Sequence, residues 1–312
     1  MDAVSQHSLI ARIKACVQLM RPANVLTAVA DILAGVAVSG LTVELADRGN
    51  GWFFIPELGK ISFLVLSSAS LYAGGVVLND FFDAELDKKE RPERPIPSGL
   101  VPRTVAFFLG VVLLSIGIQV AAFVSLISVG VAVGVALLIA AYNGLSKHHS
   151  VFGPLNMGLC RGGNLLLGIS AVPYAMQRFW FIAFIPVIYI AAITMISRGE
   201  VKGSTSGSLR IAGWLYALTI MFILSLSAIP FFHLRLSLPY LVLFAGVIFS
   251  RLKRAQSSRQ PADIRSAVKA GVLALILMDA AIAAGFSGWD YGLLIVLLLP
   301  LSVLIAKNFA VT

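Results

Sequence analysis

Apolar runs separated by short polar gaps recur along almost the whole chain. Most of these runs are about as long as a helix must be to cross a hydrocarbon core of about 30 Å. The pattern predicts an all-α polytopic membrane protein with nine to ten transmembrane helices. The runs lie near residues 24–43, 61–80, 104–121, 122–142, 154–173, 179–197, 209–230, 238–251, 266–286 and 289–306. The third and fourth share one unbroken apolar stretch and are divided on length alone, and the eighth is the shortest.

The composition supports this fold class and narrows the partners. Hydrophobic residues make up 58% of the chain and charged residues only 12%, which excludes an ordinary soluble domain. The net charge of +9 lies in the gaps between apolar runs and forms no basic domain. We therefore expect contact with membrane lipids and none with nucleic acid.

The distribution of basic residues predicts the orientation of the chain. Nineteen of the 24 Lys and Arg residues fall in the gaps on one side of the ten spans, four fall on the other side, and Arg161 lies within a span. Loops rich in Lys and Arg stay in the cytoplasm. Both termini are therefore expected to be cytoplasmic, and a bacterial cytoplasmic membrane is the expected location.

The segment before the first span has its own pattern. Residues 1–22 carry apolar side chains at three- and four-residue steps, which predicts a short amphipathic helix on the cytoplasmic membrane surface. The residues that make this face are Ile10, Ile13, Val17 and Met20. We expect the whole chain, 1–312, to form one transmembrane domain.

An acidic stretch follows the second span. Residues 79–99 hold six acids, four bases and three prolines, directly after the uncharged run 61–78. If the helix continues past Leu78, then Asn79, Asp83 and Asp87 lie within roughly 80° of one another on one helix face. Oxygen ligands in this arrangement suit Mg²⁺, which usually takes one or two carboxylates and leaves its other positions to water and phosphate oxygens. The alternative is a solvated loop that only fixes orientation.

Other polar groups are predicted to lie on the same side of the membrane. The bases Lys88, Lys89, Arg91 and Arg94 follow the acidic residues and can supply counter-charge to phosphates. Tyr142 and Lys147 close the fourth span, and the sequence SRGEVKG, residues 197–203, closes the sixth. These segments can together bind one anionic ligand.

At these motifs the chain resembles the UbiA superfamily of intramembrane prenyltransferases. Residues 79–87, NDFFDAELD, match that family's NDxxDxxxD signature, and RPIPSG at 94–99 is similar to its usual continuation. Arg21-Pro22 before the first span, and Tyr142 with Lys147 after the fourth, also fit. The resemblance implies a UbiA-type helical bundle. It also implies Mg²⁺-assisted transfer of an isoprenyl group from an isoprenyl diphosphate to a small acceptor, with loss of pyrophosphate.

The resemblance also implies roles for individual residues. Asn79, Asp83 and Asp87 would hold the metal, and Asp80 would be a ligand or would orient the others. Taking the resemblance together with the residue patterns, we expect the substrate to be bound by Asp80, Arg91, Arg94, Tyr142, Lys147, Asn156, Arg161 and Asn164. We expect the catalytic set to be Asp83, Asp87, Glu200, Arg198 and Lys202.

The chain departs from the family where a second aspartate-rich motif of the DxxxD kind is expected. SRGEVKG stands there, with Glu200 as its only acid, and resembles the EboC-like branch of the family. Our hypothesis is that Arg198 and Lys202 neutralise phosphate directly and that one Mg²⁺ serves where relatives use two.

Three charged residues lie well away from the ends of predicted spans, and each has two interpretations. Arg161 either faces the substrate cavity with Asn156 and Asn164, or forms an interhelical ion pair with Asp31 or Asp279. The two aspartates are either bases on the acceptor side or halves of structural pairs.

Two functions other than prenyl transfer are compatible with the sequence. One is a non-catalytic carrier or binding protein for isoprenoid lipids, which the altered second motif favours. The other is a small-solute permease. The residues leave the acceptor and the donor chain length open.

Overall fold

The structure, a computed structural model, describes residues 9–48, 54–147, 149–199 and 206–308, and the regular structure in these ranges is helical. The first half of the chain forms α1 (Leu9–Leu19), α2 (Pro22–Ser39), α3 (Leu41–Arg48), α4 (Phe54–Glu90), α5 (Arg103–Ala121), α6 (Leu126–Ala141) and the π-helical turn η1 (Tyr142–Ser146). The second half forms α7 (Phe152–Ile169), α8 (Pro173–Phe179), η2 (Trp180–Ala183), α9 (Phe184–Ser197), α10 (Ser206–Ser225), η3 (Leu226–Ala228), α11 (Leu234–Ser258), α12 (Pro261–Ser287), α13 (Trp289–Val296) and α14 (Leu298–Asn308).

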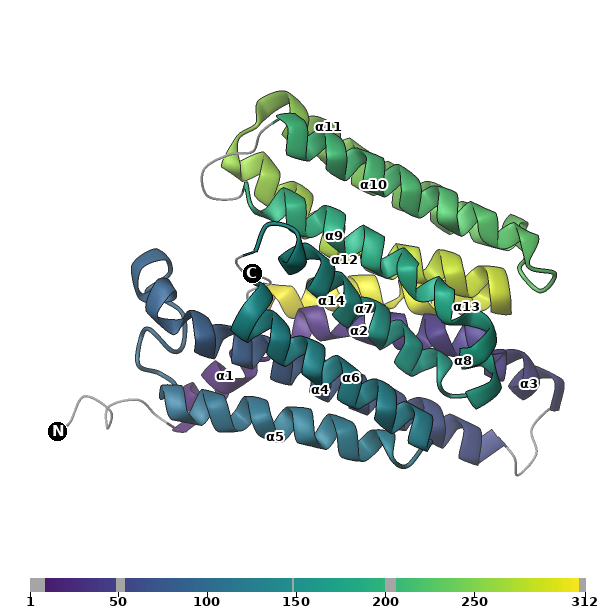
Figure 1. The fold of residues 1–312 in the computed structure, drawn as a ribbon, viewed down its shortest axis with the longest axis horizontal. Helices are drawn as coiled ribbons and strands as arrows, with labels where there is room; N and C mark the ends of the chain where they lie inside the picture. Colours follow the sequence, from purple (N-terminus) through teal and green to yellow (C-terminus); the bar gives the residue numbers. More distant parts are fainter. Residues whose placement is uncertain (1–8, 49–53, 148, 200–205, 309–312) are drawn as a thin grey trace.

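Nine helical segments within these ranges are long and apolar enough to cross a membrane, and they correspond to nine of the ten predicted spans. The remaining predicted span, 154–173, is α7. α7 carries Asn156, Arg161 and Asn164, and it is not among these nine segments. It nevertheless runs through the bundle, packed against α2, α6 and α9 (Figure 1).

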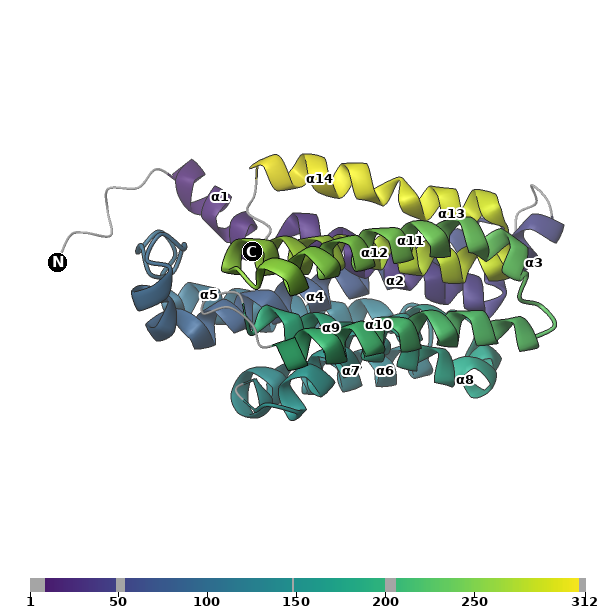
Figure 2. The ribbon, with the colours of Figure 1, turned by 90° about the horizontal axis from the view of Figure 1, so that it is seen from above.

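The helices lie roughly side by side along the long axis of the molecule. α2, α7 and α12 occupy the interior, while α10 and α11 form one edge and α5 forms the opposite edge (Figure 1). Seen from above, α13 and α14 cover one face of α2 and α12, and α6 and α7 lie on the other side (Figure 2). α1 and the far end of α14 lie at the same end of the bundle as the end of α4.

Close contact between α2 and α7 depends on two glycines. A Cβ atom on Gly35 would lie 2.4 Å from the carbonyl oxygen of Leu165, and one on Gly168 would lie 2.5 Å from that of Ile32. Backbones of membrane helices approach this closely only where small residues face each other. Polar side chains on the two helices are therefore brought within hydrogen-bonding reach of one another.

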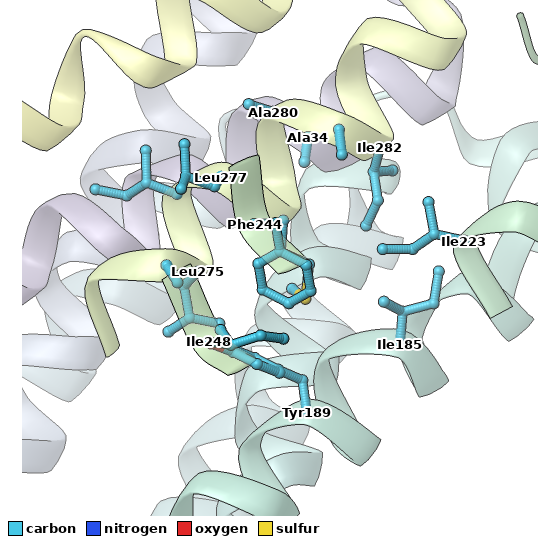
Figure 3. Packing of buried hydrophobic residues seen from close by; sticks show 14 of the residues in the cluster. Ala34, Ile185, Tyr189, Ile223, Phe244, Ile248, Leu275, Leu277, Ala280 and Ile282 are labelled. Carbon is cyan, nitrogen blue, oxygen red and sulfur yellow. The ribbon is translucent and has the colours of Figure 1, made fainter. Parts of the chain in front are cut away.

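The largest buried cluster lies between α9, α11 and α12. Tyr189 and Phe244 meet edge to face at 5.1 Å between ring centroids, and Ile248 and Leu275 pack around them (Figure 3). The Tyr189 hydroxyl donates to the Gly271 carbonyl at 2.7 Å, which satisfies its polar end. The outer helices show the opposite pattern, with exposed apolar side chains such as Phe108 and Leu126. Such surfaces suit a lipid environment.

The structure corrects three boundaries. α4 continues to Glu90 and is roughly 55 Å long at 1.5 Å per residue. The eighth span is not short: α11 has 25 residues, because the helix extends through the basic residues that end the apolar run. The last span consists of α13 and α14, which are separated at Leu297.

The third and fourth spans do separate within their shared apolar stretch. The Ser125 side chain accepts a hydrogen bond from the Ser128 amide at 3.0 Å and so caps the start of α6. This N-cap gives a physical reason for the division, which the sequence pattern placed on length alone.

α1 divides its apolar side chains between two environments. Leu19 is buried and Met20 packs in the cluster around Val77, whereas Ile10 and Ile13 are exposed. The predicted single apolar face is therefore split, since the end of the helix turns into the bundle at Arg21.

Candidate functional site

The acidic stretch is helical as far as Glu90, so Asn79, Asp83 and Asp87 lie on one helix, as the predicted Mg²⁺ site required. α4 carries it beyond the apolar part of the bundle, and its oxygen-bearing side chains form two groups. Asn79 and Asp83 contact Lys147, whereas Asp80 and Asp87 contact arginines. At 100° per residue, Asp87 is about 20° from Asp80 and about 40° from Asp83, so it borders both groups.

In the first group two oxygen atoms converge on one cation. The Lys147 ammonium donates to Asn79 Oδ1 at 3.2 Å and forms an ion pair with Asp83 Oδ2. Both partners of the ion pair are largely buried, with side chains 16% and 15% exposed. Tyr142 lies close enough to Asp83 for their electrostatic interaction to matter.

A π-helical turn places Lys147. In η1 the Lys147 amide donates to the Tyr142 carbonyl, five residues back, at 3.0 Å. Asn156 on α7 holds this turn by contacting the Ser146 hydroxyl at 3.0 Å. Asn156 therefore contacts the turn that positions Lys147, and its role in substrate binding stays a prediction. π-Turns occur frequently at functional sites.

Asn143 also belongs to the first group, although we did not predict it as a site residue from the sequence. Its Oδ1 accepts from Asn79 Nδ2 at 3.1 Å, and its own amide donates to the Ile139 carbonyl at 3.1 Å. Its position between Tyr142 and Lys147, in a polar segment at the end of an apolar run, is the sequence feature that indicates a site residue.

The second group joins three segments of the chain. Arg94 donates to Asp87 Oδ2 at 2.8 Å and lies 3.4 Å from Asp80 Oδ1. Arg21 donates to the same Asp80 oxygen at 2.7 Å. The site therefore includes Arg21. The sequence indicated this residue only because Arg21-Pro22 fits the pattern of the family.

Backbone geometry fixes both arginines. Arg21 is in the left-handed conformation, with φ 49°, at the point where α1 gives way to α2. A non-glycine residue in this region is uncommon and strained, and such residues cluster at functional sites. Arg94 lies in the turn after α4, which Gly99 completes with φ 78°. Arg91 is half-buried in the same turn.

Arg198 contacts the backbone of a neighbouring loop, and its predicted contact with phosphate stays a prediction. Its guanidinium donates to the carbonyl oxygens of His149 and Ser150, at 2.7 Å each, and so ties the end of α9 to the loop after η1. Glu200 and Lys202 lie outside the described residues.

Arg161 and Asn164 lie apart from these two groups, in the interior between α2 and α7. Arg161 Nε is 2.9 Å from Asp31 Oδ2, and Asn164 donates to the same oxygen at 2.9 Å. Of the interpretations that the sequence left open for Arg161, the structure shows the ion pair with Asp31.

The first group fits a hard cation. Asn79 Oδ1 and Asp83 Oδ2 already meet one positive charge, that of Lys147, and Asp87 is on the adjoining part of the helix. Among the described residues no three His, Cys, Asp or Glu side chains gather into a metal site. Mg²⁺ is usually bound by one or two carboxylates, with its other positions taken by water and phosphate oxygens.

An apolar groove of about 320 Å³ lies elsewhere, between α6, α7 and the start of α9. Leu138, Leu159, Gly163 and Phe184 are among its lining residues. None of the charged residues of the two groups lines it.

Fold and site together define a polytopic membrane protein with an acid- and base-lined polar site at one end of a helical bundle. The chain belongs to the UbiA prenyltransferase family, whose sequence profile matches residues 37–273. It is therefore an integral, multi-pass membrane protein.

Individual relatives agree with this assignment. The digeranylgeranylglyceryl phosphate synthase of Methanosarcina mazei is 31% identical over 196 residues, which cover 58% of this chain and 66% of that protein. The chain thus matches just under two thirds of the relative's length. A solved structure of digeranylgeranylglyceryl phosphate synthase superposes with a TM-score of 0.64 at 20% identity, covering 88% of this chain and 99% of that one. A UbiA homologue from Archaeoglobus fulgidus, solved with GPP and Mg²⁺, superposes with a TM-score of 0.56 at 13% identity, covering 90% and 99%.

Proposed function

We propose that the protein is an intramembrane prenyltransferase that moves an isoprenyl group from an isoprenyl diphosphate to a small acceptor, with Mg²⁺ as cofactor. The observation that carries the proposal is the convergence of Asn79 and Asp83 on one cation, beside two arginines, at the motif that the family shares. Without ligands, the acids and bases of the site neutralise one another. When ligands bind, the acids can hold the metal and the bases can hold the diphosphate.

In this proposal Asn79, Asp83 and Asp87 hold Mg²⁺, with Asp80 oriented beside them by Arg21 and Arg94. Bound Mg²⁺ would supply positive charge against the departing diphosphate. Lys147 and Arg94 exchange their carboxylate partners for phosphate oxygens, and Tyr142 is placed to donate a hydrogen bond. Positioned donors of this kind stabilise the leaving group as its negative charge grows.

The SRGEVKG segment has a more limited role in this proposal than the sequence suggested. Arg198 fixes the loop that carries Lys147, because both of its hydrogen bonds go to backbone carbonyls. We retain Glu200 and Lys202 as groups that complete the site from this segment, with Arg91 as a further phosphate contact. One Mg²⁺ per site remains the expected stoichiometry.

The names of the relatives point to a substrate class. A digeranylgeranylglyceryl phosphate synthase makes a glyceryl phosphate with two geranylgeranyl chains, so its acceptor has one. The Archaeoglobus fulgidus homologue binds GPP, an isoprenyl diphosphate, with Mg²⁺. We propose geranylgeranyl diphosphate as the donor and a glyceryl phosphate with one isoprenyl chain as the first acceptor to test.

Both termini are proposed to face the cytoplasm. The excess of basic residues on one side of the spans supports this orientation. α1 and the far end of α14 lie at the end of the bundle that holds the site, which places the site on the same side (Figure 1).

Pyrophosphate release tests the proposal. Purified protein in detergent is supplied with geranylgeranyl diphosphate and the glyceryl phosphate acceptor, with and without Mg²⁺. We expect metal-dependent release that is lost in Asp83→Asn and kept in Glu85→Gln, a matched acid whose side chain is 66% exposed. Release that Asp83→Asn leaves unchanged would refute the assigned site.

A non-catalytic isoprenoid-lipid binding protein is the second candidate. The observation that favours it is the engagement of Arg198 with backbone carbonyls, in a segment whose only acid is Glu200. Mg²⁺-dependent binding of the donor, without pyrophosphate release with any acceptor in a membrane lipid extract, would establish this function.

A further inference from the structure

A second cluster of charged side chains lies inside the bundle, separate from the proposed diphosphate site. Asp31 on α2 and Asp279 on α12 are both completely buried. Arg161 on α7 forms an ion pair with Asp31 at 2.9 Å and donates to the Thr27 hydroxyl. Ionisable groups this deep in a membrane bundle are costly and are kept for a purpose.

The hydrogen bonds in this cluster are distributed unequally. Asp31 Oδ2 accepts a hydrogen bond from the Asn164 amide at 2.9 Å, and it forms an ion pair with Arg161 Nε, also at 2.9 Å, that lacks hydrogen-bond geometry. Asp31 Oδ1 and both carboxyl oxygens of Asp279 are buried and accept no hydrogen bond from any N–H or O–H group of the described residues. Asp31 is thus stabilised as an anion, and Asp279 has no such support.

Asp31 and Asp279 interact with each other through their side chains, and both interact with the charge of Arg161. Two carboxylates and one guanidinium would leave a net negative charge in the buried interior. Burying a charge without a counter-charge costs far more free energy than neutralising that charge by binding a proton.

We propose that Asp31 and Asp279 form an intramembrane proton-binding site, in which Asp279 is a neutral carboxylic acid that donates a hydrogen bond to Asp31 Oδ1. One proton satisfies Asp31 Oδ1, gives Asp279 its hydrogen bond and makes the cluster with Arg161 neutral. The hydrogen bond joins α12 to α2, which Arg161 and Asn164 already join to α7.

A metal cation fits the same position poorly. Only three carboxylate oxygens are without donors, whereas hard cations take six or more oxygen ligands. The guanidinium of Arg161, paired with Asp31 at 2.9 Å, repels a second cation. A proton needs only one oxygen on each side.

The surrounding titratable groups have other partners. Tyr189 on α9 interacts with Asp279, but its hydroxyl donates to the Gly271 carbonyl at 2.7 Å. Tyr240 on α11 donates to the Trp289 carbonyl, and Tyr291 on α13 donates to the Leu33 carbonyl at 3.2 Å. Asp31 and Arg161 are therefore the charged groups that decide the proton's position.

Infrared spectroscopy tests the proposal on the full chain in detergent at neutral pH. A protonated carboxyl gives a C=O stretching band that ionised carboxylates lack and that shifts in deuterium oxide. We expect such a band in the wild type, its loss in Asp279→Asn, and its retention in Asp290→Asn, a matched change at an exposed aspartate. A wild-type spectrum without the band would overturn the proposal, even if a variant fails to fold.

Thermal unfolding of the variants gives an independent readout. Asp279→Asn keeps a neutral donor beside Asp31, so its melting temperature should stay close to that of the wild type. Asp31→Asn leaves Arg161 without a counter-charge and should lower the melting temperature by about 5–10 °C. Equal losses in the two variants would contradict a neutral Asp279. A melting temperature that rises when sodium replaces choline, without the carboxylic acid band, would show a metal cation site instead.

Discussion

Lys147 and Asp83 are 64 residues apart in the sequence and form an ion pair at the end of α4. The same ammonium donates to Asn79, so it takes the position where the predicted metal ligands converge. Because Lys147 already contacts these oxygens, the proposed Mg²⁺ site would require Lys147 to move when the metal binds. In the proposed function, this movement toward the diphosphate would couple metal binding to substrate binding.

Removal of the Lys147 charge should have opposite effects on the binding of metal and on the binding of donor. In Lys147→Met, Mg²⁺ no longer competes with an ammonium, so we expect metal to bind about tenfold more tightly in the absence of donor. Geranylgeranyl diphosphate should bind about tenfold more weakly, because a phosphate contact is lost. Calorimetric titrations of Mg²⁺ and of the donor measure both. Lys147→Arg is the matched control, since it keeps the charge, and weaker Mg²⁺ binding in Lys147→Met would exclude the exchange.

Arg94 should be required for the stability of the site as well as for substrate binding. It is the cation that Asp80 and Asp87 share, and both carboxylate side chains are only 7% exposed. Arg94→Met leaves Asp87 without its ion pair, which should cost about 3 kcal/mol of unfolding free energy. Denaturation in detergent measures this loss. Lys88→Met removes a base whose side chain is 57% exposed, and it should show no measurable change.

A change at Arg198 distinguishes loop positioning from direct phosphate contact. Arg198→Lys cannot bridge the carbonyls of His149 and Ser150, each held at 2.7 Å, so the loop after η1 should loosen. We expect a loss of about 1–2 kcal/mol of stability and a lower kcat. A raised KM for the donor with unchanged melting temperature would instead support the direct phosphate contact that the sequence suggested.

The contact between α2 and α7 should not tolerate a methyl group. In Gly35→Ala the new Cβ would lie 2.4 Å from the Leu165 carbonyl oxygen, so the helices must separate. We expect a loss of about 1–3 kcal/mol, measured by denaturation. Gly130→Ala on α6 is the matched control, because nothing lies within 4 Å of its added Cβ. That variant should be neutral, or more stable by up to about 1 kcal/mol.

Local sequence determined most of the fold and one half of the site. Hydropathy alone placed the spans, because each helix must satisfy its own backbone hydrogen bonds in lipid. The four-residue spacing of Asn79, Asp83 and Asp87 placed these residues on one side of α4, because helix geometry is local. The motif and its RPIPSG continuation indicated the family, which the sequence profile then confirmed.

Tertiary structure decided which charges meet. The sequence offered several bases for the acids of α4, and only the turn at η1 and the left-handed residue Arg21 determine that Lys147 reaches Asp83 and Arg21 reaches Asp80. Arg161 likewise had two acids available, and the close approach of α2 and α7 selected Asp31 as its ion-pair partner. Ion pairs form over a few ångströms between helices that are remote in the chain. Their choice depends on how those helices pack, which no local pattern specifies.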